Sequence, residues 1–456
     1  MEIILFWGVA SFLLSANAAT LARRAVGTAT VSLASPSGTP SQLASGFIYG
    51  IPDNGTSVST AIPDNFYRDF GFKACRAGGA QLGVPNRGWA YGEQEYVGRW
   101  ASTLSNYRTS RKFGAEFIVL VHDLWGADGL DANGLPYPGD NGDWSLYERF
   151  TDRLISDMQS NGMIDGVILD IWNEPDGTNF WNRPYTQYLD YYVRAHNKFR
   201  ARLSGMRVSG PSLAGHPSTT NPFWTQWFAR ISQQNTIPDI YSWHSLSNEA
   251  DPQRDLVTFN NFRAQYNTPV RPIDINEYGT PSEQSAATSV WYMARFERTN
   301  IRGLRANWAS ASDLHDYMAN VLGKNGQTYF PNGDYQAYKY YAAMSGTRVA
   351  TSGSADNLFD VFATKGTGIG SVKILAGNRR NLNTYDITIT GLTSVGLPAS
   401  GTVKIRTRRF NWTGQYQPVT TVSDLGIVEH SYTNNAVTFW VTPDTIETAY
   451  AFEFVQ

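Results

Sequence analysis

The chain has 456 residues, a length that predicts two domains rather than one compact core. Its formal net charge of −2, with only 17% charged residues, argues against nucleic acid as a partner. The one cysteine, Cys75, excludes an intramolecular disulfide, and the apolar residues around it favour a buried thiol over a nucleophile.

The first 19 residues have the features of a secretory signal peptide. Residues 3–15 are largely apolar, and Ala16-Asn17-Ala18 fits a small-x-small cleavage site, although Glu2 is unusual in the leading region. No later stretch of the sequence reaches the roughly 20 continuous apolar residues of a membrane span. We therefore expect a secreted, extracellular protein with no membrane partner, in which Asn54 and Asn411 stand in glycosylation sequons.

From residue 46 to residue 345, short apolar runs alternate with helical patterns. The eight runs that predict strands are 47–51, 74–78, 116–122, 166–172, 207–210, 240–244, 272–276 and 304–308. The helical patterns cover 65–70, 96–113, 145–161, 185–203, 221–233, 254–266, 285–299 and 335–345. Eight alternating pairs predict a (β/α)8 TIM barrel, an α/β fold that takes about 250 residues or more.

From residue 346 to residue 456 the pattern changes to period-two alternation. Six short alternating stretches are separated by Gly, Asn and Pro, and no helical pattern comes between them. This texture predicts a C-terminal antiparallel β-sandwich. The N-terminal segment 20–45 is expected to add a strand to it through residues 28–33, followed by a linker over 35–41 that is rich in Ser, Pro and Gly.

Two glutamates stand directly after predicted strands, where packing explains them poorly. Glu174 follows the fourth strand of the barrel and precedes Pro175, and Glu277 follows the seventh strand and precedes Tyr278-Gly279. Active sites of such barrels lie at the carboxyl ends of the strands, so the two carboxylates are expected to face each other across the barrel mouth. Such a pair predicts acid/base and nucleophilic chemistry on a glycosidic bond.

The residues around these glutamates resemble a known group of enzymes. Asn173-Glu174-Pro175 and Asn276-Glu277-Tyr278 look like the acid/base and nucleophile signatures of the clan A glycoside hydrolases. Within that clan, the segments 172–176, 209–215 and 239–244 resemble glycoside hydrolase family 39, which includes β-xylosidases and α-L-iduronidases. The resemblance covers roughly residues 46–456.

The resemblance implies a role for each glutamate. Glu174 would protonate the departing oxygen and then activate water, which requires a raised pKa from partial burial and a charged partner. Glu277 would be the nucleophile and must stay ionised, so it needs hydrogen-bond donors or a cation nearby. Arg76, which follows the second strand and precedes a Gly pair, is the best candidate for that cation; a solvent-facing arginine is the alternative.

Two polar residues are predicted to complete the site. Asn173 would bond the sugar 2-hydroxyl and the nucleophile, with a turn-forming Asn as the alternative. His244, after the sixth strand, would contact the nucleophile, with a capped structural histidine as the alternative. Leu246 stands where members of the family often carry Tyr, a departure that leaves the sugar identity open.

Aromatic residues make up 14% of the chain, which fits either a large core or platforms on which sugar rings stack. Trp308, at the end of the eighth strand, is predicted to form the apolar floor of the sugar site. His122 and Trp125, at the end of the third strand, are predicted to contact the sugar at the rim. For a tryptophan at a strand end, burial in the core is the alternative.

The sequence predicts neither a metal nor a cofactor. Its six histidines show no HExxH pattern and no paired ligand spacing. The segment 128–134 resembles a calcium loop only superficially, because it lacks the spacing and the closing Glu of an EF-hand.

The motifs together predict a secreted retaining glycoside hydrolase that cleaves plant or fungal wall glycans by double displacement, exo-acting and β-xylosidase-like. Retention requires carboxyl groups about 5–5.5 Å apart, whereas about 6.5–9.5 Å implies inversion. An endo-acting β-glycanase is one alternative, and a catalytically inactive carbohydrate-binding protein is another. The sandwich is expected to support the barrel, because its alternating positions show no row of aromatic residues. The sugar, its linkage and the oligomeric state stay open.

Overall fold

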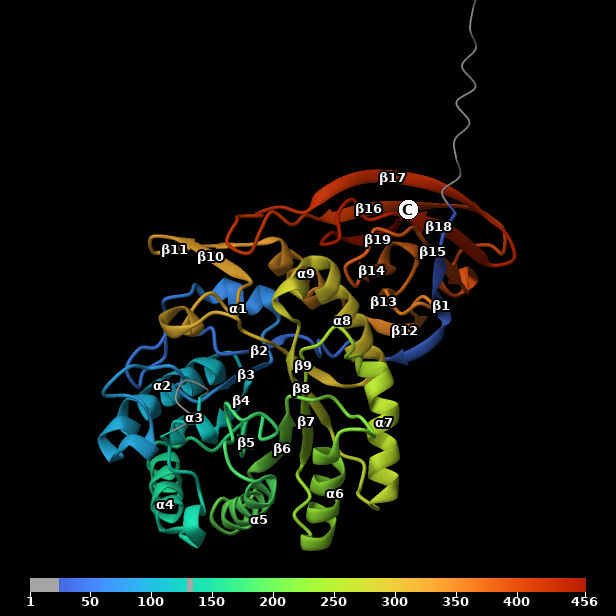
Figure 1. The fold of residues 1–456 in the computed structure, drawn as a ribbon. Coiled ribbons are helices and arrows are strands. Elements are labelled where there is room, and N and C mark those ends of the chain that lie inside the picture. The colour runs from blue at the N-terminus through green and yellow to red at the C-terminus, as the bar shows by residue number, and fades with distance from the viewer. Residues whose placement is uncertain (1–23, 129–133) are drawn as a thin grey trace, which may run out of the picture.

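The computed structural model describes residues 24–128 and 134–456. The predicted signal peptide and most of the calcium-like segment lie outside the described residues. The chain forms a barrel surrounded by helices and, above it in Figure 1, a large sheet that includes both the first and the last strand. No helix in the described part of the chain is long and apolar enough to cross a bilayer.

Eight parallel strands close into the barrel. In chain order they are β2 (Gly46–Ile48), β3 (Ala74–Ala77), β4 (Glu116–Leu120), β5 (Val167–Asp170), β6 (Arg207–Leu213), β7 (Ile240–Ser245), β8 (Ile273–Tyr278) and β9 (Arg302–Arg305). Every neighbouring pair is parallel, and β9 pairs with β2 to close the ring. The predicted (β/α)8 barrel is confirmed, and the strand boundaries differ from the prediction by a few residues.

Helices cover the outside of the barrel. They are α1 (Asp64–Phe70), α2 (Glu93–Lys112), α3 (Val121–Trp125), α4 (Ser145–Ser160), α5 (Tyr185–Arg202), α6 (Pro222–Gln234), α7 (Pro252–Gln265), α8 (Ala286–Thr299) and α9 (Gly333–Ala342). The short helix α3 was not predicted, because the apolar run 116–122 continues without a break from β4 into it. A hairpin of β10 (Leu322–Asn325) and β11 (Thr328–Pro331) follows β9.

The second domain is one continuous sheet that folds back on itself. Its strands, in the order β17-β16-β19-β14-β13-β12-β1-β15-β18, are β17 (Ser423–Tyr432), β16 (Gly401–Phe410), β19 (Ala449–Val455), β14 (Lys373–Asn378), β13 (Phe359–Lys365), β12 (Thr347–Ser352), β1 (Gly27–Gly38), β15 (Tyr385–Thr390) and β18 (Ala436–Val441). Its two edges meet, since the rings of His430 and Phe439 are 5.2 Å apart.

The predicted sandwich is confirmed, but its sheet is not purely antiparallel. Strand β1 pairs antiparallel with β12 and parallel with β15. The exception arises because β1 comes from the opposite end of the chain and lies between two strands that no hairpin joins.

Helix α8 joins the two domains. It is buried along most of its length, and it packs on β13 and β14 of the sandwich as well as on the barrel. Trp291 at its centre is fully buried, and its indole Nε1 donates to the carbonyl oxygen of Asn357 in the sandwich at 2.9 Å. At Gly377 on β14, an added Cβ would lie 2.3 Å from the carbonyl oxygen of Ala287 on α8. The backbones of α8 and β14 are therefore in direct contact at this point of the domain interface.

Replacing Gly377 by alanine is expected to lower the free energy of unfolding by about 1–3 kcal/mol, because the new methyl group overpacks the contact between α8 and β14. Gly370→Ala is the matched control, since a Cβ there has no heavy atom within 4 Å. Urea unfolding followed by tryptophan fluorescence measures both variants. Equal stability of the two variants would contradict this account of the domain contact.

Candidate active site

A pocket of about 310 Å³ lies at the carboxyl ends of the barrel strands. Glu174 and Glu277 both line it, together with Arg76, Asn173 and Trp308. The other lining residues come from the ends of neighbouring strands and from the loops that follow them. They are Ile48, Tyr49, Ala80, Gln81, Leu120, His122, Asp123, Asp128, Phe180, Leu246, Asn307, Ala309 and Leu314.

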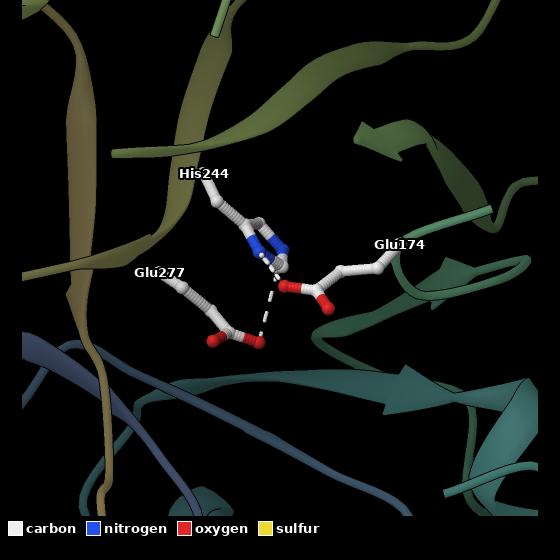
Figure 2. Close-up of side chains that lie close together, drawn as sticks. All are labelled: Glu174, His244 and Glu277. Carbon is white, nitrogen blue, oxygen red and sulfur yellow. Dashed lines mark hydrogen bonds and ion pairs between the residues drawn. The ribbon is translucent and has the colours of Figure 1, made fainter. Parts of the chain in front are cut away.

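The carboxylates of Glu174 and Glu277 point toward each other, with His244 beside both (Figure 2). Nδ1 of His244 lies 2.9 Å from Oε1 of Glu174, and its Nε2 lies 3.7 Å from Oε1 of Glu277. One nitrogen or oxygen atom from each of the three side chains lies within 4.8 Å of the other two. The nearest oxygens of the two glutamates are therefore no more than 4.8 Å apart.

The loop after β5 holds Glu174 in a backbone conformation that few residues adopt. Its φ of 44° lies in the left-handed region, and Ser212, whose carbonyl accepts the Glu174 N–H at 2.9 Å, has a φ of 56°. The Asp176 carboxylate strengthens this link, because it accepts the backbone N–H groups of Ala214 and Gly215. Such conformations cost roughly 1–3 kcal/mol each and persist where their surroundings enforce them. The loops after β5 and β6 together fix the position of Glu174.

Arg76 on β3 is fully buried and binds three polar side chains. Its Nε donates to Asp170 at 2.9 Å. Its Nη1 donates to Oε1 of Glu277 at 2.7 Å, and its Nη2 donates to Oδ1 of Asn173 at 2.7 Å. The structure thus brings the predicted cation against the predicted nucleophile. It also turns the amide oxygen of Asn173 toward Arg76, which leaves the amide nitrogen as the donor for a ligand.

Asp170 and Asn276 belong to the site although the sequence pattern did not single them out. The carboxylate of Asp170, at the end of β5, accepts hydrogen bonds from Arg76, from Ser212 and from the amide of Asn276. All of these side chains are buried. One feature of the sequence could have pointed to Asp170, namely that it ends the apolar run 166–170. A carboxylate in such a buried run is expected to have a partner, because carboxylates are almost never fully buried alone. Asp170, together with the Ser212 and Asn276 side chains that bind it, holds the guanidinium of Arg76 in place.

The pKa values of Glu174 and His244 are shifted in opposite directions. Burial raises the pKa of Glu174, but its hydrogen bond with His244 and the positive charges of His244 and Arg76 outweigh burial, so the pKa lies below its ordinary value. Burial lowers the pKa of His244, but the charge of Glu277 and the contact with Glu174 outweigh it, so that pKa lies above its ordinary value. The expectation of a raised pKa for Glu174 is therefore wrong for the protein on its own. The cause is the imidazole of His244 at 2.9 Å, whose hydrogen bond and positive charge favour the ionised form of the Glu174 carboxyl.

His244 also differs from the prediction in its main partner. It was expected to contact the nucleophile, but its closer contact is with Glu174. Oε1 of Glu277 is already bound by Arg76 at 2.7 Å, and the imidazole comes no nearer to it than 3.7 Å. Leu246 lines the pocket with an apolar side chain and offers no hydroxyl to the nucleophile.

The ligand atoms of Glu174, His244 and Glu277 are close enough together to hold a metal ion. The chemistry of the donors argues against a metal there. Arg76 already binds the Glu277 oxygen, and the raised pKa of His244 opposes the loss of the proton that metal binding to this imidazole requires. The arrangement is better suited to sharing a proton between two carboxylates.

Trp308 and His122 line the pocket, as their predicted roles require. Trp308 is 44% exposed, and its Nε1 donates to the carbonyl oxygen of Gly279 at 2.8 Å, which fixes the indole. Nε2 of His122 lies 2.8 Å from Asp123, and its buried Nδ1 has no hydrogen-bond partner among the described residues. An indole plate and a free imidazole nitrogen are suitable groups for contacting a sugar ring and its hydroxyls.

Trp125 contradicts its predicted role at the rim. It is fully buried on α3 and does not line the pocket. Its Nε1 donates to the carbonyl oxygen of Pro136 at 3.0 Å, and its ring packs edge-on against Phe150. The reason is the helix that begins at Val121, which turns this side chain into the core between α3 and α4.

The sandwich contributes an arginine that holds two loops of the barrel mouth. Arg379, directly after β14, donates to the Glu283 carboxylate at 2.7 Å in the loop after β8. It also donates to the carbonyl oxygens of Ser247 and Ala250 in the loop after β7, at 2.9 and 2.5 Å. These loops follow the strands that carry His244 and Glu277, so the sandwich helps to set the spacing of the site.

Relatives with assigned activities match part of this chain, whereas the sequence matches no protein-family model. A 3-O-α-D-galactosyl-α-L-arabinofuranosidase from Bifidobacterium longum subsp. longum is 26% identical over 381 residues, which cover 70% of this chain and 30% of that protein. A 3-O-β-L-arabinopyranosyl-α-L-arabinofuranosidase from Bifidobacterium pseudocatenulatum is 24% identical over 372 residues, which cover 71% of this chain and 35% of that protein. The chain thus spans about a third of the length of the curated relatives it matches.

Solved structures share the fold over nearly the whole chain. N2152 from Neocallimastix frontalis superposes with a TM-score of 0.74 at 18% identity, covering 94% of this chain and 100% of that one. A family 39 β-xylosidase from Caulobacter crescentus superposes with a TM-score of 0.55 at 15% identity, covering 91% of this chain and 100% of that one. The resemblance to glycoside hydrolase family 39 is therefore confirmed at the level of the fold.

A titration of the histidines by NMR tests the shared proton. His244 is expected to stay protonated above pH about 6.5, the ordinary value, and its pKa is expected to fall in Glu174→Gln. Because the folded pKa is raised, its contribution to stability is fully present below about pH 6.5 and is lost as the pH rises through the folded pKa. His196, whose pKa is lowered by burial, is the internal control and should not respond. An unchanged His244 titration in the variant would contradict the contact.

Proposed function

We propose that this protein is a secreted retaining glycoside hydrolase that acts on neutral glycans of plant or fungal cell walls. The observation that carries the proposal is the pair of carboxylates, Glu174 and Glu277, in one pocket with oxygens within 4.8 Å. The fold shared with a family 39 β-xylosidase and the similarity to two arabinofuranosidases support the same class of reaction. Secretion is proposed from the signal-like first 19 residues alone.

The spacing of the carboxylates favours retention over inversion. Inverting enzymes need about 6.5–9.5 Å between the two carboxyl groups to admit a water molecule, and retaining enzymes need about 5–5.5 Å. The nearest oxygens of Glu174 and Glu277 come within 4.8 Å of each other, which is shorter than the separation that inversion needs. This supports double displacement through a covalent glycosyl-enzyme.

In the first step of this mechanism, Glu277 attacks the anomeric carbon while the glycosidic bond breaks, and Glu174 gives a proton to the departing oxygen. Arg76 holds and orients the Glu277 carboxylate through its 2.7 Å hydrogen bond. We propose that the proton that Glu174 needs comes from His244, whose pKa is raised, and passes along their 2.9 Å contact when substrate binds. In the second step, Glu174 takes a proton from water, which attacks the glycosyl ester and frees Glu277.

The charges around the pocket favour a neutral sugar over a uronic acid. Four carboxylates line the pocket, those of Asp123, Asp128, Glu174 and Glu277. Arg76 is the only Lys or Arg among the described lining residues, and its three nitrogens already bind protein side chains. The neighbouring residues 129–133 include no Lys or Arg in the sequence. Asp128 is paired with Arg99, and Asp123 lies against His122. A uronate carboxylate would therefore meet the two glutamates and find no unpaired Lys or Arg among the described lining residues.

The size of the pocket supports action at a chain end. Its volume of about 310 Å³ stands at the small end of the roughly 300–1,000 Å³ typical of ligand pockets, which leaves room for few sugar residues. We therefore propose exo-action, β-xylosidase-like as the resemblance implies. An α-L-arabinofuranosidase is the second candidate, because both curated relatives carry that activity in their names.

Substitution of each glutamate tests the mechanism on aryl glycosides. Glu277→Ala is expected to abolish turnover while sugar binding persists, because no nucleophile remains. Glu174→Ala is expected to lower kcat by about 10²–10⁴-fold on substrates with poor leaving groups, and less on nitrophenyl glycosides, which depart without a proton. Azide should restore turnover in Glu174→Ala and give a glycosyl azide with the substrate's anomeric configuration, as read by NMR.

Glu429→Gln, an exposed carboxylate on β17, is the matched control for these variants and should keep full activity. An active Glu277→Ala would remove that residue as the nucleophile. Glycan binding by the wild type without turnover of any substrate would favour the inactive carbohydrate-binding alternative.

A panel of aryl glycosides tests the charge argument. Turnover of a β-xyloside or an α-L-arabinofuranoside is expected to exceed that of a β-glucuronide or α-iduronide by about 100-fold or more in kcat/KM, since like charges repel in the pocket. A preference for either uronide would contradict the argument. Activity confined to wall polysaccharides would move the function to the endo-acting alternative.

A further inference from the structure

Trp440 on the sandwich is exposed to solvent far from the candidate active site. Among the described residues, two tryptophans are exposed by more than a third of their surface, Trp308 at 44% and Trp440 at 66%. Trp308 belongs to the pocket. Trp440 lies on the edge strand β18, and Figure 1 places β18 at the upper right of the sandwich, away from the barrel strands. A single exposed apolar side chain is common on protein surfaces, so the groups around Trp440 decide whether it marks a contact site.

A groove of about 740 Å³ runs beside the Trp440 indole. Val26 and Leu382, both more than half exposed, form its apolar sides. Thr442 and the buried Thr384 also line the groove, with their hydroxyl oxygens 2.7 Å apart. The groove thus combines one flat aromatic surface with hydroxyl groups that can both donate and accept hydrogen bonds.

The outer face of the sheet continues this surface with a row of threonines. Thr30 on β1 is in register with Thr388 on β15, which is in register with Thr438 on β18. The hydroxyls of Thr388 and Thr438 are 2.9 Å apart. Side chains of alternate residues on a strand share one face, so Trp440 stands on the same face as Thr438.

The charges of this surface indicate the kind of ligand. The groove has one cation and one anion, Arg24 and Asp444, and Asp444 also forms an ion pair with Arg409. Asp386, in register with Trp440 on β15, adds one more carboxylate to this face, so its charges nearly balance. A nucleic acid or an anionic membrane requires several unpaired cations, which this surface does not offer in the described residues. A stable protein interface buries about 800 Å² per partner around an apolar centre, whereas the apolar part of this groove is limited to Val26, Leu382, Trp440 and Pro443. A neutral, hydroxyl-rich polymer fits both the charge balance and the hydrogen-bonding groups.

We propose that the Trp440 groove is a second glycan-binding site, which holds a neutral polysaccharide chain against the sandwich. A sugar ring would stack its apolar face on the indole while its hydroxyls bond to Thr442 and to the exposed Thr438. Because the groove and the pocket belong to one rigid protein, binding at the groove raises the local concentration of chain ends near the pocket. The sequence predicts that the sandwich supports the barrel, because it shows no row of aromatic residues. The proposal adds glycan binding to that role, through one exposed tryptophan and the neighbouring threonines.

Affinity electrophoresis of the full-length protein tests the proposal. Wild type, Trp440→Ala and the control Leu425→Ala, which removes an exposed apolar side chain from β17, are run in native gels that contain arabinoxylan, arabinogalactan or xyloglucan. Trp440→Ala is expected to bind at least one of these polymers roughly tenfold more weakly, because it loses the stacking surface, and Leu425→Ala is expected to bind as the wild type does. Dextran sulfate serves as the anionic polymer.

Turnover of the best aryl glycoside is measured on the same three proteins and is expected to be equal, since Trp440 lies outside the pocket. This separates the two hypotheses, because loss of binding in Trp440→Ala supports the groove even if no aryl glycoside is turned over. Equal retardation of wild type and Trp440→Ala in every neutral polymer would overturn the proposal. Stronger retardation by dextran sulfate than by the neutral polymers would also overturn it. A wild-type dimer in sedimentation that Trp440→Ala converts to a monomer would overturn it too, because the groove would then be an interface between copies of the chain.

Discussion

The buried guanidinium of Arg76 is the interaction on which the candidate site depends. It joins Asp170 on β5 to Glu277 on β8 and to Asn173 in the loop after β5, with three contacts of 2.7–2.9 Å. A buried charge is tolerated only when it is paired, and breaking such a pair costs about 3–5 kcal/mol. The positions of three barrel strands are therefore linked to the orientation of the predicted nucleophile.

His244 gives the site its second constraint. It contacts Glu174 at 2.9 Å and approaches Glu277 to 3.7 Å, so one imidazole responds to the charge of both carboxylates. Loss of the Glu277 charge, as in a glycosyl ester, removes the largest influence that holds the proton on this histidine. The proposed double displacement therefore requires a proton to move between His244 and Glu174, whose backbone is held by its hydrogen bond to Ser212.

The two domains act as one unit because they share α8 and because Arg379 crosses between them. The sandwich therefore packs directly against the barrel and contacts the loops at its mouth. The opposite end of the same sheet presents Trp440 and the threonine row to solvent. The sandwich thus supports the loops after β7 and β8 on one side and presents the proposed Trp440 groove on the other.

The sequence by itself determined the elements and the two glutamates. Alternation of apolar runs with helical patterns is a local property, so eight strands and their helices could be predicted, and Glu174 and Glu277 followed from their places at strand ends. Only the tertiary structure decided the partners, because the side chains that meet at Arg76 are 94 and 201 residues away in the chain. The direction of Trp125, the parallel pairing of β1 and the lowered pKa of Glu174 were decided in the same way. Each depends on contacts across the fold, which no local pattern in the sequence records.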